Sequence, residues 1–164
     1  MTTLTLNETY TATATELYRN LVLQATLGQV EQASVWYHEA QEVAQEVANN
    51  LNASLEIGAG VVSAFSPRER WASNITKAVA FSLGHAVSGL KNNSKMANDV
   101  LAGGISALKG LKTNAFARAI FGDTDAVVID VWMMRAANME TDSPSQGQYF
   151  ALSLACRPCA STGP

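Results

Sequence analysis

The sequence predicts an all-α protein that folds as a single-domain helical bundle. Apolar residues recur at helical spacing in successive segments, and glycines or polar clusters separate these segments. The clearest local signal is a capping box, Ser66-Pro67-Arg68-Glu69, with proline at the first helical position. With 164 residues, 48% of them hydrophobic and 15% charged, the chain is long enough to bury a core.

The first half of the chain predicts three helices. One spans residues 7–27, and a second spans residues 30–50 and carries one apolar stripe. Residues 54–65 are small and apolar on all sides. This pattern favours a central helix, which Gly58 and Gly60 would allow its neighbours to approach closely, and a buried strand is the alternative.

The rest of the chain predicts four more helices and a short last one. The four span residues 66–84, 94–106, 112–121 and 123–138, and the last spans residues 148–156. Asp130 would then be an inward-facing residue inside a helix. We expect a flexible N-terminus at 1–6, one folded domain at 7–156 and a flexible tail at 157–164.

Positive charge is concentrated in the middle of the chain. Residues 57–122 contain eight basic and two acidic residues, a net charge of +6, whereas residues 1–56 carry −6 and residues 123–164 carry −3. A basic face on an acidic protein is suited to phosphate binding. A solvated surface with chance clustering of charge is the alternative.

Two charged residues stand at positions that suggest chemistry. Lys112 follows Gly110 at the mouth of the 112–121 helix, where unpaired N–H groups and the helix dipole favour an anion. A lysine there can bind phosphate or, once deprotonated, act as an amine nucleophile. Asp130 ends an apolar run that draws it toward the core, where a carboxylate needs a hydrogen-bond donor.

Two segments carry a resemblance to a known family. They are Leu108-Lys109-Gly110-Leu111-Lys112-Thr113-Asn114-Ala115 and Ile129-Asp130-Val131-Trp132. They resemble the helix-hairpin-helix superfamily of base-excision DNA glycosylases, whose bifunctional members have the hairpin Leu-x-Gly-hydrophobic-Gly-x-Lys-Thr-Ala and a later Asp at the same separation. In this chain the hairpin is two residues shorter and lacks the second glycine, and Trp132 stands where the family has His. The chain is also similar to small tailed-phage proteins with the same shortened hairpin.

The resemblance implies a helix-hairpin-helix, glycosylase-like domain that binds DNA and removes a damaged or modified base. Lys112 would be the nucleophile that forms a Schiff base with the sugar, and Asp130 would steer it and stabilise positive charge on the sugar. Together with the basic segment, it assigns DNA binding to Lys109, Gly110, Leu111, Thr113, Asn114, Arg118, Arg68 and Arg70. Candidates for a base pocket are Trp36, Phe65 and Trp132.

Less specific alternatives remain for these residues. The chain would then be a non-catalytic nucleic-acid-binding protein, or a phage interaction protein, that retains the fold. Lys112 would only contact phosphate or form a salt bridge, Asp130 would cap backbone groups, and Trp36 would pack in the core.

The sequence predicts neither a metal nor a cofactor. Cys156 and Cys159 form one C-x-x-C, but a zinc site needs about four ligands and a family-type iron–sulfur cluster needs four cysteines. No apolar run approaches the roughly 20 residues that cross a bilayer, and no export signal is visible. We therefore expect DNA but no membrane as a partner, and a cytoplasmic location, in the host cell if the chain is phage-encoded.

Overall fold

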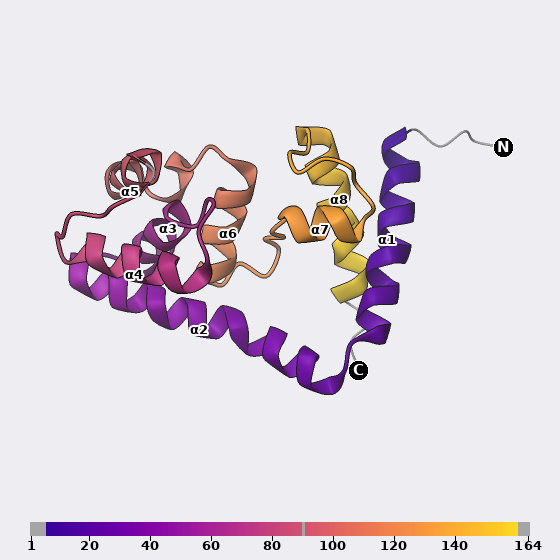
Figure 1. The fold of residues 1–164 in the computed structure, drawn as a ribbon, viewed down its shortest axis with the longest axis horizontal. Helices are drawn as coiled ribbons and strands as arrows, with labels where there is room; N and C mark the ends of the chain where they lie inside the picture. Colours follow the sequence, from indigo (N-terminus) through magenta and orange to yellow (C-terminus); the bar gives the residue numbers. More distant parts are fainter. Residues whose placement is uncertain (1–5, 90, 161–164) are drawn as a thin grey trace. The chain divides into compact units, whose positions relative to one another are not determined.

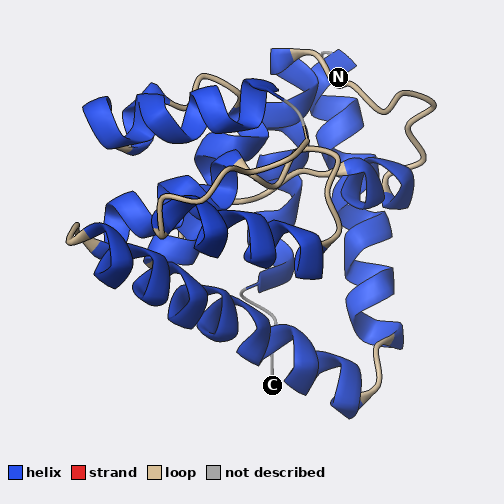
Figure 2. Cartoon of the chain, turned by 60° about the vertical axis from the view of Figure 1, so that its left-hand side comes forward, coloured by secondary structure: helices blue, strands red, loops and turns tan. Residues whose placement is uncertain are grey.

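The computed structural model describes residues 6–89 and 91–160, which form eight α-helices, one short 3-10 helix and no strand (Figure 2). The prediction of an all-α fold is therefore confirmed. The elements are α1 (Leu6–Gln24), α2 (Leu27–Leu51), α3 (Leu55–Ala64), α4 (Trp71–Ser82), α5 (Lys91–Gly103), η1 (Ile105–Ala107), α6 (Leu111–Phe121), α7 (Val131–Ala136) and α8 (Gln146–Ala160).

The helices group into two compact units. The central unit, Gln32–Ala126, contains most of α2 and all of α3 to α6. The terminal unit combines Met1–Glu31 with Val127–Pro164 and contains α1, α7 and α8. Two segments that are far apart in the sequence therefore fold together in the terminal unit.

Helix α3 forms the core of the central unit, where it contacts α4, α5 and α6 (Figure 1). Residues 58–64 of this helix are all buried. A Cβ on Gly58 would overlap the carbonyl oxygen of Ala44 in α2. A Cβ on Gly60 would lie 2.6 Å from Cγ1 of Val100 in α5. The segment is therefore a helix in close contact with its neighbours, as predicted, and the alternative of a buried strand is wrong.

Two tyrosines fix α7 and the segment before it in the terminal unit. Tyr18 of α1 is buried, and its hydroxyl donates to the carbonyl oxygen of Met133 in α7 (2.9 Å). The hydroxyl of Tyr149 in α8 donates to the carbonyl oxygen of Val127 (3.1 Å) and accepts the N–H of Ile129 (3.3 Å). Burial raises the pKa of Tyr149, so this hydroxyl remains a donor.

The predicted capping box at Ser66–Glu69 is wrong. Residues 66–70 form a turn, and α4 begins only at Trp71, with Arg70 as its N-cap residue. Arg68 has a φ of +62°, a left-handed conformation that a right-handed helix cannot contain. The backbone conformation therefore delays the start of α4 despite the favourable residue types.

The predicted helix over 123–138 is also wrong. Residues 126–130 are not helical, and α7 covers only Val131–Ala136. Asp130 has a φ of −107° and a ψ of −176° and is the N-cap residue of α7, not an inward-facing residue within a helix. Because an aspartate at this position satisfies N–H groups at the helix start, capping prevails over continuation of the helix.

Several helix ends differ from the prediction. Helix α5 begins at Lys91, three residues before the start of the helix predicted over 94–106. Helix α8 continues to Ala160, so residues 157–160 are helical although a flexible tail was predicted from residue 157. Helix α1 begins at Leu6, the last residue of the flexible N-terminus predicted at 1–6, and the remaining residues of the predicted flexible ends, 1–5 and 161–164, lie outside the described residues.

Replacing Gly58 with alanine should destabilise the central unit. The added Cβ overlaps a backbone oxygen that no rotamer change can move, so we expect the free energy of unfolding to fall by about 2–4 kcal/mol. Urea denaturation followed by circular dichroism measures this change. Gly28→Ala is the control, because nothing lies within 4 Å of a Cβ at that position. An equal loss in both variants would contradict the close approach of α3 to α2.

Candidate nucleic-acid interface

The first turn of α6 carries Lys112, whose side chain is exposed. Gly110 is the N-cap residue of α6 and, as a glycine, supplies no side-chain cap of its own. The hydroxyl of Thr113 donates to the carbonyl oxygen of Gly110 (3.0 Å), and the ammonium of Lys109 donates to that of Ser106 (3.0 Å). A helix start with lysines on both sides is favourable for an anion.

Buried hydrogen bonds fix the position of this turn. The hydroxyl of Ser63 in α3 donates to the carbonyl oxygen of Thr113 (2.6 Å). The side-chain amide of Asn114 donates to the carbonyl oxygens of Ile105 (3.2 Å) and Leu108 (3.4 Å), which ties the preceding connection to α6. Two of the predicted DNA-binding residues, Thr113 and Asn114, therefore hold the backbone in place with their side chains.

Three of the eight basic residues between 57 and 122 are held by acidic partners. The pairs are Lys77 with Glu69, Lys95 with Asp99 (2.7 Å) and Arg118 with Asp123 (2.5 Å). The other five are exposed and form no ion pair with a described residue: Arg68, Arg70, Lys91, Lys109 and Lys112. Of the predicted DNA-binding bases, only Arg118 forms an ion pair with a described residue, and its hydrogen bond holds the pKa of Asp123 below the ordinary value.

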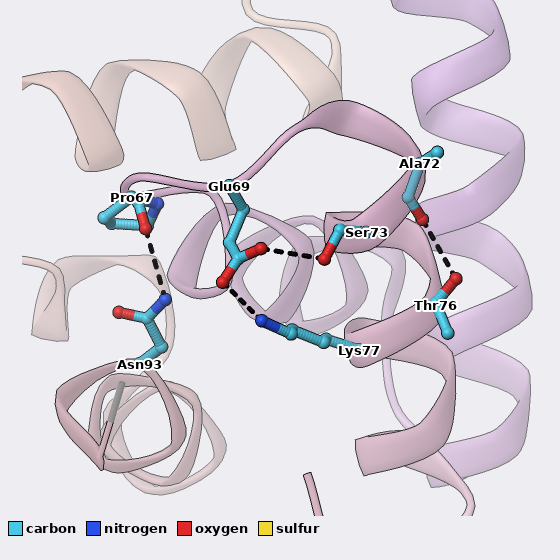
Figure 3. Close-up of polar contacts among 7 residues, drawn as sticks. All are labelled: Pro67, Glu69, Ala72, Ser73, Thr76, Lys77 and Asn93. Carbon is cyan, nitrogen blue, oxygen red and sulfur yellow. Dashed lines mark hydrogen bonds and ion pairs between the residues drawn. The ribbon is translucent and has the colours of Figure 1, made fainter. Parts of the chain in front are cut away.

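Glu69 holds the turn that carries Arg68 and Arg70 (Figure 3). Its carboxylate pairs with the ammonium of Lys77 and accepts a hydrogen bond from the hydroxyl of Ser73 (2.8 Å). These hydrogen bonds, first that of Lys77 and then that of Ser73, hold the pKa of Glu69 below its ordinary value. The carboxylate therefore anchors the turn to α4.

The start of α5 lies against the same turn. Asn93 is buried, and its side-chain amide donates to the carbonyl oxygen of Pro67 (3.4 Å; Figure 3). Lys91 lies two residues before Asn93, at the first position of α5. Three of the unpaired bases, Arg68, Arg70 and Lys91, are therefore carried by one turn and the helix start that contacts it.

Four aromatic side chains form a cluster between α2, α4 and α6. The ring of Trp36 lies at its centre, 5.0 Å from the rings of Tyr37 and Trp71 and 5.9 Å from that of Phe116. Trp36 and Trp71 are half-buried, and Tyr37 is 39% exposed. The base-pocket candidate Trp36 therefore packs against other rings and still contributes to the surface.

Two of the unpaired bases lie next to this aromatic cluster along the chain. Arg70 immediately precedes Trp71. Lys112 lies one helical turn before Phe116 and on the same face of α6. Basic residues beside aromatic rings are typical of surfaces that bind single-stranded nucleic acid.

The other two base-pocket candidates have different surroundings. Phe65 is 1% exposed, and its ring lies 5.5 Å from that of Phe81, so it is part of the core. Trp132, in the terminal unit, is 68% exposed, and the guanidinium of Arg135 lies 5.1 Å from the centre of its ring.

Asp130 caps α7 with its carboxylate. Its Oδ1 accepts the N–H groups of Trp132 (2.9 Å) and Met133 (3.0 Å). Asp130 belongs to the terminal unit and Lys112 to the central unit. The catalytic pairing of these two residues therefore stays a prediction.

Residues 6–89 and 91–160 contain no group of three or more His, Cys, Asp or Glu side chains placed to hold a metal ion. In the same part of the chain, no helix combines the length and the apolar character needed to cross a membrane.

The sequence profile of a family of unknown function, DUF7178, matches residues 2–161. This chain belongs to DUF7178. No curated protein and no solved structure matches it. For this member of DUF7178, the geometry of the central unit is therefore the basis for a functional proposal.

Sequence reasoning missed two ion pairs that shape the surface of this DUF7178 chain. Glu69 was assigned to a capping box, although its spacing to Ser73 and Lys77, four and eight residues later, indicates side chains on one face of a helix. The pair between Arg118 and Asp123 depends on a chain reversal after α6, and the pattern of charges alone does not reveal it.

Removing the Glu69 carboxylate should reduce the loss of folding stability at acid pH. The folded pKa of Glu69 lies below its ordinary value of 4.5. The carboxylate therefore stabilises the folded state above about pH 4.5, and this contribution is lost as the pH falls through the lowered pKa. We expect Glu69→Gln to lose less stability than the wild type between about pH 6 and pH 3, as measured by urea denaturation. Glu39→Gln, at an exposed position of α2, is the control, and an equal reduction in both variants would refute the role of Glu69.

Proposed function

We propose that this protein binds DNA through the basic surface of its central unit. One observation carries the proposal: five of the eight bases between 57 and 122 are exposed and have no acidic partner among the described residues. Positive charge that is not neutralised within the protein is available to the phosphate backbone, which supplies most of the non-specific affinity of DNA-binding proteins.

The start of α6 supports a phosphate contact in particular. Its N-cap residue, Gly110, has no side chain that could occupy the first N–H groups, and Lys112 adds an exposed ammonium at the same end of the helix. The hydrogen bond from Ser63 to the carbonyl oxygen of Thr113 fixes this end on the core. A phosphate bound here would therefore meet donors that are already in position.

The connection between α5 and α6 is the segment that would serve as the hairpin of a helix-hairpin-helix element. Residues 104–110 join the two helices, and Gly104 adopts a φ of +69°, which allows the tight path of the chain. In the family that the sequence resembles, this hairpin contacts backbone phosphate. We propose the same role for residues 108–113 here.

A narrower form of the proposal adds base excision by Lys112 and Asp130. The neutral amine of Lys112 would form a bond to C1′ while the bond from C1′ to the base breaks, and the base would leave with a proton. Opening of the sugar ring would then give the Schiff base. Asp130 would stabilise the positive charge on the sugar.

Lys112→Gln should weaken DNA binding and reduce its salt dependence. Loss of one phosphate contact lowers the magnitude of the slope of log K against log salt concentration by about 1. Fluorescence anisotropy with a labelled duplex at several salt concentrations measures this slope. A wild-type protein without salt-dependent binding would refute the proposal.

Lys95→Gln is the matched control for this experiment. Lys95 is also an exposed lysine of the central unit, but it is paired with Asp99 at 2.7 Å. We therefore expect a slope close to that of the wild type. Equal changes in both variants would mean that net charge, and not the start of α6, governs binding.

Borohydride trapping on abasic-site and modified-base duplexes tests the catalytic form. Reduction of a Schiff base would leave a covalent adduct, which Lys112→Ala abolishes. Asp130→Asn should slow adduct formation strongly, and because asparagine also caps helices, this variant removes the charge while the cap remains. Salt-dependent binding without an adduct would exclude excision and leave DNA binding in place.

A further inference from the structure

A groove of about 440 Å³ lies between α2 and the C-terminal half of α6, within the central unit. Tyr37, His38 and Gln41 line it from α2, and Ala119 and Ile120 line it from α6. Its volume is within the range of small-ligand sites, which runs from roughly 300 to 1,000 Å³. The groove is therefore large enough for a planar ring.

Tyr37 gives this groove an aromatic wall. Its side chain is 39% exposed, and its ring meets the ring of Trp36 edge-to-face, with 5.0 Å between the centroids and an interplanar angle of 87°. Trp36 in turn packs against Trp71 and Phe116. The aromatic cluster therefore holds the ring of Tyr37, which is suited to stacking.

Gln41 gives the groove a polar group in a fixed orientation. Its Nε2 donates to the carbonyl oxygen of Ile120 (3.1 Å), and its Oε1 accepts no hydrogen bond from a described residue. At the end of the groove, Asp123 accepts hydrogen bonds from the guanidinium of Arg118 (2.8 Å) and the N–H of Asp125 (2.9 Å). Asp123 is the only acidic residue among the described residues that line the groove, and Arg118 neutralises its charge.

Helix α6 connects the groove to the proposed phosphate site. Lys112 is exposed at the start of α6, and Ala119, which lines the groove, lies seven residues later on the same side of the helix. Seven residues of helix span about 10 Å along the axis. Phe116 and Ile120 are buried, so a strand that spans this distance would pass over them and place a phosphate at Lys112 and a nearby base at the groove.

We propose that the groove between α2 and α6 receives an unpaired nucleobase, which stacks on Tyr37 while the backbone of the same strand contacts Lys112. The inference rests on the proposed DNA binding and specifies its substrate class as single-stranded nucleic acid. A paired base is stacked inside the duplex and cannot enter a groove without extrusion.

The test compares two labelled strands of twelve nucleotides by fluorescence anisotropy at one salt concentration. One is oligo(dT), and the other has the same phosphate backbone with an abasic residue at every position. We expect the wild type to bind oligo(dT) about fivefold or more tighter than the abasic strand, because one stacked base contributes roughly 1–3 kcal/mol. Tyr37→Ala should bring the ratio of the two affinities close to one, and Tyr37→Phe should preserve it.

Each outcome separates this inference from the proposed function. Equal affinity of the wild type for both strands overturns the base site and leaves phosphate binding intact. No binding of either strand overturns both. A ratio that Tyr37→Ala leaves unchanged, in a variant with the circular dichroism spectrum of the wild type, also overturns the base site.

Discussion

The close contact of α3 with its neighbours is the constraint on which the central unit depends. At Gly58 the helix approaches the backbone of α2 so closely that no side chain fits, and Gly60 makes similar room for Val100 of α5. Because the packing there relies on backbone proximity, α3 occupies one defined position. From this position Ser63 donates to the carbonyl oxygen of Thr113, and this hydrogen bond fixes the start of α6 against α3. Small residues of α3 therefore determine the position of the candidate phosphate site.

Ion pairs within the central unit determine which basic side chains remain available. The turn after α3 is anchored by Glu69, which forms an ion pair with Lys77, whereas Arg68 and Arg70 remain exposed. The chain reversal after α6 likewise brings Asp123 to Arg118. Glu69 and Asp123 thus fix a turn and a helix end, while Arg68 and Arg70 form no ion pair with a described residue. A concentration of positive charge that survives folding is a stronger indication of a phosphate-binding surface than the same charge counted along the sequence.

The sequence predicts the parts of this fold that local patterns determine. The apolar stripes of α2 and α6 and the all-round apolar character of α3 follow from helical spacing, so their positions were confirmed. The wrong predictions concern segments whose backbone conformation depends on a residue that is distant in the sequence. The segment before Asp130 looks like a helix interior, but its backbone is held by Tyr149 from α8, about twenty residues later. For the candidate site, composition locates the basic segment, whereas the ion pairs that neutralise three of its bases depend on tertiary structure.

The environment of Lys112 distinguishes the two roles that the sequence allows. A phosphate contact requires an accessible ammonium, and Lys112 is exposed at the start of α6. A nucleophile requires a neutral amine, and amines are deprotonated most readily where burial or a neighbouring positive charge disfavours the ammonium. The central unit by itself does not bury Lys112, and Asp130 already serves as the cap of α7. Phosphate binding therefore needs nothing beyond the geometry of α6, whereas excision also needs a carboxylate that belongs to the other unit.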